Sequence, residues 1–118
     1  MNNDIQKLQR FVRATNYLTV TQIYLQDNYL LKQPLQVKDL KKRLFGHWGT
    51  CPGINFVYAN LNFLAQKHKQ EMIFVLGPGH GFAALQANLF LEGTLGKYYS
   101  EATRDAQGIA GVFEYHCS

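Results

Sequence analysis

Residues 72–81 read MIFVLGPGHG, five consecutive apolar residues from Met72 to Leu76 and then a glycine-rich loop. Apolar runs of this length, without alternation, are typical of strands buried on both faces, as in a parallel sheet between helices. Glycine and proline at the end of the run predict a loop. The segment therefore predicts a buried parallel-type strand, with a loop at the carboxyl end, where open α/β sheets bind their ligands.

Helical patterns surround this predicted strand. Apolar residues recur every three or four positions over about Asp4–Gln26, Pro52–Lys67 and Ala83–Leu91, and more weakly over Ala106–Tyr115. A short basic helix is expected from Asp39 to Gly46. These elements predict an α/β fold, mostly helical by content, with the apolar strand central and helices on both sides. A single strand is not a sheet, however, and the chain offers few partners for it.

Length and composition indicate one small domain spanning 1–118. The chain has 118 residues, of which 47% are hydrophobic and 14% aromatic, and this composition excludes a wholly disordered chain. No apolar run approaches the length of about 18 residues that a transmembrane helix requires, and the first residues lack the pattern of a secretory signal. Two cysteines, Cys51 and Cys117, fit a reducing compartment, so we expect a cytoplasmic protein with no membrane partner.

The net charge of +4 is mostly spread along the chain. One dense basic cluster lies at Lys38, Lys41, Lys42 and Arg43. Such clusters can bind nucleic acid, but the solvated face of a short helix is the favoured interpretation. No aromatic and glycine pattern of an RNA-binding sheet accompanies the cluster, so we expect no nucleic-acid partner.

Two glycine loops carry the candidate chemistry. Residues 46–53 read GHWGTCPG and place His47 just before a predicted helix, as residues 77–81 do for His80. Backbone N–H groups at a helix start can hold an anion, and an imidazole can move protons near neutral pH. The alternative is that each histidine merely bonds its own loop, and that Cys51 is a small packing residue. We expect both rings to point into one cleft lined by Gly49, Thr50, Gly77 and Gly79.

The same loops resemble a known family. Residues 46–50 (GHWGT), followed by Pro52, Gly53, Asn55, Phe56 and Tyr58, are similar to the amino-terminal region of bacterial phosphoketolases. The GPGHG loop of residues 77–81 stands at the matching distance. Residues 16–18 (NYL), 22–25 (QIYL) and 91–94 (LEGT) also fit, so the resemblance runs from about Phe11 to Gly111. Transketolases are more distant relatives in this superfamily of thiamine diphosphate enzymes.

The resemblance implies an aldehyde-lyase. Phosphoketolases use thiamine diphosphate with Mg²⁺ to cleave xylulose 5-phosphate or fructose 6-phosphate with inorganic phosphate, forming acetyl phosphate and an aldose phosphate. It implies that His47 and His80 are catalytic, and that Thr50, Gly77, Gly79 and His80 bind the cofactor. No metal ligands are assigned, because the Gly-Asp-Gly motif that holds the metal is absent from this sequence. The full-length family members are expected to be oligomers.

Departures from the family pattern shape the expectation for this chain. Cys51 stands where threonine is common, and Phe82 stands where a small residue is common. Family members continue well beyond the length of this sequence. We therefore expect an incomplete thiamine diphosphate-binding domain, an amino-terminal fragment that is inactive alone. The alternative is a non-enzymatic remnant domain that binds a partner or forms oligomers.

Overall fold

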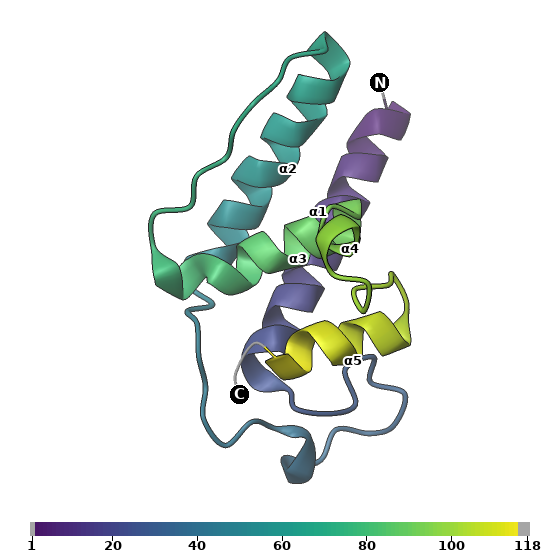
Figure 1. The fold of residues 1–118 in the computed structure, drawn as a ribbon, viewed down its shortest axis with the longest axis vertical. Helices are drawn as coiled ribbons and strands as arrows, with labels where there is room; N and C mark the ends of the chain where they lie inside the picture. The colour runs from purple at the N-terminus through teal and green to yellow at the C-terminus, as the bar shows by residue number, and fades with distance from the viewer. Residues whose placement is uncertain (1, 116–118) are drawn as a thin grey trace.

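The structure, a computed structural model, describes residues 2–115 and consists of helices and the segments between them (Figure 1). The helices are α1 (Asn2–Tyr24), α2 (Cys51–His68), α3 (Phe82–Glu92), α4 (Leu95–Tyr98) and α5 (Ala106–Tyr115), with the 3₁₀ turns η1 (Val37–Asp39) and η2 (Gly79–Gly81). α1 and α2 pack side by side, and α3 crosses both (Figure 1). The helical patterns therefore predicted α1, α2, α3 and α5 to within about two residues at each end.

The predicted α/β fold with a buried parallel strand is wrong. Within residues 2–115 no strand forms, and residues 70–78 run as an extended segment along the outside of α2 (Figure 1). Ile73 is 93% exposed and Val75 is 82% exposed. Phe74, in contrast, is half-buried and packs edge-on against Tyr58 of α2, with ring centroids 5.0 Å apart.

The physical reason is that a strand needs neighbouring strands to satisfy its backbone and cover its faces. The described residues supply one isolated antiparallel bridge, between Leu25 and Leu40, and that bridge lies away from this segment. The apolar run therefore keeps the extended backbone that its residue types favour. It packs one face against α2 and leaves the other exposed.

The short basic helix expected from Asp39 to Gly46 is also wrong. The structure has only η1 there, and η1 ends where the chain pairs with the end of α1. The backbone N–H of Gln26 donates to the carbonyl of Asp39 at 2.8 Å. Pairing with α1 takes these backbone groups away from any local helix, so the basic cluster lies on an irregular segment.

Two apolar clusters hold the helices together. The larger one joins α1, α3 and α5, and its members include Leu18, Ala87, Phe90 and the fully buried Phe113. The smaller one consists of Ile23, Cys51, Ala83 and Ala84, which come from the end of α1 and the starts of α2 and α3. This second cluster brings together the two helix starts that follow the glycine loops.

Candidate functional site

The two histidine loops meet at one corner of the molecule, where α2 and α3 begin (Figure 1). The backbone N–H of His47 donates to the carbonyl of His80 at 2.9 Å. The imidazole centroids lie 5.6 Å apart, with an angle of 72° between the ring planes. Both side chains are exposed, so the edge-to-face pair is open to solvent and to a ligand. The structure thus brings together two residues that are far apart in the sequence.

Glycines let the first loop approach the second so closely. Gly46 has a φ of +104°, a conformation that side-chain-bearing residues rarely adopt. A Cβ on Gly46 would also lie 3.2 Å from Ile23 and 3.6 Å from the carbonyl oxygen of His80. At Gly49, a Cβ would lie only 2.8 Å from the ring of His47. Any side chain at Gly49 would therefore displace that imidazole.

The backbone N–H groups at the start of α2 are less available than the sequence predicted. Thr50 and Cys51 donate their N–H groups to the carbonyls of His47 and Trp48, and Pro52 has none. The N–H of Gly81 likewise donates to Pro78. Since these groups are engaged in turns, the imidazole pair is a stronger feature of this corner than a row of free N–H donors.

The remaining predicted cofactor residues lie around the histidines. Thr50, at the start of α2, donates its hydroxyl to the carbonyl of His47 at 3.1 Å. Gly77 and Gly79 are exposed, and a Cβ on either would meet nothing within 4 Å. The backbone of this loop is therefore open beside the two imidazoles.

Residues 2–115 gather no cluster of the side chains that most often bind a metal ion. Among them, no group of three or more histidine, cysteine, aspartate or glutamate side chains is placed to hold one. Mg²⁺ prefers several oxygen ligands in an octahedral arrangement. Any Mg²⁺ that accompanies an anionic cofactor here would need ligands other than such a cluster.

Buried polar side chains join α1, α2 and α3 near the histidine loops, and they were not identified from the sequence. Asn55, on α2, donates to Asn16 of α1 at 2.8 Å and accepts from Asn88 of α3 at 2.8 Å. The signal was present, because Asn55 lies four residues from both Cys51 and Ala59 and so shares their buried helix face. Gln22 of α1 donates to the carbonyl of Ala83 at 3.0 Å.

Cys51 belongs to this support and does not act as an exposed nucleophile. Its side chain is fully buried, and its thiol lies 3.2 Å from the carbonyl of His47 and within hydrogen-bonding reach of the backbone of Ala84. Burial raises the pKa of the Cys51 thiol above its usual value, despite these hydrogen bonds. A thiol with a raised pKa is a poor nucleophile at neutral pH, which favours the packing interpretation.

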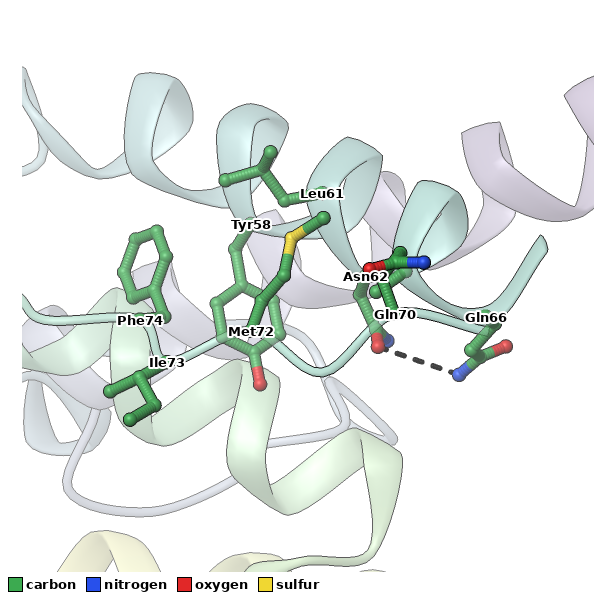
Figure 2. Close-up of a pocket in the computed structure, with 9 residues that line it drawn as sticks. Tyr58, Leu61, Asn62, Gln66, Gln70, Met72, Ile73 and Phe74 are labelled. Atoms are coloured by element: carbon green, nitrogen blue, oxygen red, sulfur yellow. Dashed lines mark hydrogen bonds between the residues drawn. The ribbon is translucent and has the colours of Figure 1, made fainter. Parts of the chain in front are cut away.

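A separate cavity lies along α2, away from both histidines. It has a volume of about 550 Å³ and lies between α2 and the extended segment. Figure 2 shows Tyr58, Met72 and Phe74 on its wall, with Asn62 accepting a hydrogen bond from Gln66 nearby. The hydroxyl of Tyr58 donates a hydrogen bond to the carboxylate of Glu92, whose two oxygens lie 2.8 and 2.9 Å from the hydroxyl oxygen.

Comparison with known proteins agrees with the resemblance of the loops. The family model described as "XFP N-terminal domain" matches residues 1–117. A probable phosphoketolase of Nitrosospira multiformis is 50% identical over 94% of this chain, and one of Gloeobacter violaceus is 49% identical over 93%. A protein of Rhizobium meliloti named probable phosphoketolase 2 is 54% identical over 90%.

The chain spans only 14% of the length of each of these relatives. None of the helices in residues 2–115 has both the length and the apolar character needed to cross a membrane. The family match covers nearly the whole chain, and the glycine loops that carry the resemblance meet in space. The chain therefore belongs to the phosphoketolase family, as part of its amino-terminal domain.

Proposed function

We propose that this chain supplies the two histidine loops of a phosphoketolase active site. The substrate would be xylulose 5-phosphate or fructose 6-phosphate, cleaved with inorganic phosphate to acetyl phosphate and an aldose phosphate. The observation that carries the proposal is the imidazole pair, whose centroids lie 5.6 Å apart at an exposed corner. The names of the relatives, which are probable phosphoketolases, supply the reaction class.

The chemistry assigned to the histidines follows from the reaction. Thiamine diphosphate, when bound, supplies the electron sink for breaking the carbon–carbon bond. A hydroxyl of the substrate must then leave as water, and hydroxide is a poor leaving group without a proton donor. In this proposal the ring nitrogens of His47 and His80 bond the ketose hydroxyls. One imidazolium delivers the proton to the departing oxygen.

The neighbouring residues would hold the cofactor. The hydroxyl of Thr50 and the open backbone at Gly77 and Gly79 would contact its anionic part, with His80 beside its reactive end. The described residues hold no metal cluster of histidine, cysteine or carboxylate side chains. We therefore expect Mg²⁺ to be bound by other parts of a complete enzyme, and we expect no turnover by this chain alone. We place the complete enzyme in the cytoplasm, as an oligomer.

The test is a chimera in which residues 1–117 of this chain replace the matching region of a phosphoketolase relative. Acetyl phosphate formation from xylulose 5-phosphate and phosphate measures its activity. His47→Ala or His80→Ala should lower kcat by about 10²–10⁴, the range for a lost acid or base. His68→Ala is the matched control, since His68 is exposed at the far end of α2. An active chimera that tolerates both loop substitutions would refute the proposal.

A second candidate is a non-enzymatic domain that associates with a second copy of itself. The exposed side chains of Ile73 and Val75 favour it, because exposed apolar patches mark interaction surfaces. Sedimentation velocity on the isolated chain tests this directly. A dimer that Ile73→Lys converts to monomer would support self-association, and a monomer at all concentrations would exclude it.

A further inference from the structure

Gln22 carries a fully buried amide where α1 meets the start of α3. Its side chain is 0% exposed on α1, next to the apolar cluster of Ile23, Ala83 and Ala84. Its Nε2 donates to the carbonyl of Ala83 at 3.0 Å, and at 3.4 Å to the carbonyl of Leu18 in its own helix. Its Oε1 is buried and accepts no hydrogen bond from any of residues 2–115.

Stability does not account for a glutamine at this position. A buried acceptor without a donor costs free energy, because it loses its hydrogen bonds to water and gains none. Methionine has a similar length and shape, and it would lose the two donated hydrogen bonds but also remove the unpaired acceptor, so its net effect on stability should be small. The reason for Gln22 therefore lies in what its amide holds.

The amide holds the first turn of α3. Ala83 is the second residue of α3, and η2, which contains His80, runs directly into that helix. The position of this turn therefore sets where the imidazole of His80 lies. His47 is tied to the same place by its own backbone bond to His80. Gln22 thus adds a directional hydrogen bond from α1 to the first turn of α3, beside the apolar contact of Ile23 with Ala83 and Ala84.

We infer that Gln22 is a positioning residue that keeps the imidazole of His80 against that of His47. The inference rests on the proposed function only in taking the two imidazoles to be catalytic. The positioning of His80 by Gln22 can be tested in the isolated chain without that assumption. A buried hydrogen-bond network can fix one packing arrangement while adding little to stability. The bond from Gln22 to Ala83 lies directly beside the loops that hold His47 and His80.

The experiment compares Gln22→Met with Thr15→Val in this chain. Thr15 is the matched control because it is also fully buried on α1, and its hydroxyl bonds only the carbonyls of Phe11 and Val12 in the same helix. One measurement is the thermal midpoint of unfolding. The other is the nuclear Overhauser cross-peak between the two imidazoles in histidine-labelled protein, assigned with His47→Gln and His80→Gln.

For Gln22→Met we expect an unchanged or raised midpoint and loss of the cross-peak. For Thr15→Val we expect a lowered midpoint and a retained cross-peak. A cross-peak that survives Gln22→Met overturns the inference, as does its loss in both variants or a lowered midpoint in Gln22→Met. These results do not depend on turnover, so they remain distinct from failure of the histidine variants in the chimera.

Discussion

Replacing Asn55 with alanine is expected to destabilise the chain more than any other single loss of a hydrogen-bonding side chain on α2. Asn55 is fully buried and takes part in three side-chain hydrogen bonds. It donates to Asn16 at 2.8 Å and to the hydroxyl of Thr19 at 3.1 Å, and it accepts from Asn88 at 2.8 Å. These bonds join α2 to both α1 and α3.

The expected magnitude follows from these contacts. Each hydrogen bond contributes about 1 kcal/mol net, so three of them amount to about 3 kcal/mol. Asn88 keeps its bond to the carbonyl of Ala84 at 2.8 Å when Asn55 is lost, which limits the penalty on that side. Such a loss is a large part of the stability of a domain of this size, typically about 5–15 kcal/mol.

The assay is urea unfolding of Asn55→Ala, Asn88→Ala and the double variant. The two side chains contact each other, so their effects should not add, with a coupling of about 0.5–3 kcal/mol. Asn60→Ala is the control, since Asn60 is half-buried on the same helix and its amide donates, among the described residues, to the carbonyl of Phe56 in its own helix. Its effect should stay within about 0.5 kcal/mol. A cost for Asn55→Ala no greater than that of the control, or additive effects at Asn55 and Asn88, would refute the reasoning.

Three further predictions concern other contacts. Tyr58→Phe removes a hydrogen bond to the Glu92 carboxylate and should cost about 1.5–3 kcal/mol in urea unfolding, with no change if that bond is absent in solution. The N–H of Gly108 donates to the carboxylate of Asp105 and holds its pKa below the usual value. The carboxylate therefore stabilises the folded chain above the unfolded pKa of about 3.9, and this stabilisation is lost as pH falls through the lowered pKa. The thermal midpoint of Asp105→Ala, measured against pH, should lack this decrease. Cys51 is fully buried, and burial raises the pKa of its thiol. In a Cys117→Ser background, iodoacetamide should therefore label the folded chain far more slowly than the urea-unfolded chain. Equal labelling rates would contradict the burial of Cys51.

The sequence predicted the two histidine loops of the candidate site, but not the buried residues that hold them together. Glycines around His47 and His80, each before a helical pattern, indicate loops whose backbone can approach another segment. Pairing of the two loops depends on Ile23 and Ala83, whose sequence positions carry no sign of that contact. Gln22 likewise looks like a surface residue by type, and only the packing of α1 against the start of α3 makes it a buried donor.

Local sequence alone determined the four longer helices, α1, α2, α3 and α5, because periodic apolar residues define a buried face whatever that face packs against. It also determined the family, because the glycine loops at residues 46–50 and 77–81 are specific motifs. Tertiary structure alone decided whether residues 72–76 form a buried strand. An apolar run favours an extended, hydrophobic segment, but it does not supply the strands that would flank it. In the described chain no strand flanks them, so one face lies on α2 and Ile73 and Val75 remain exposed. Tertiary structure also decided that the two imidazoles lie together, because their separation is set by the contacts of α1, α2 and α3 rather than by either loop.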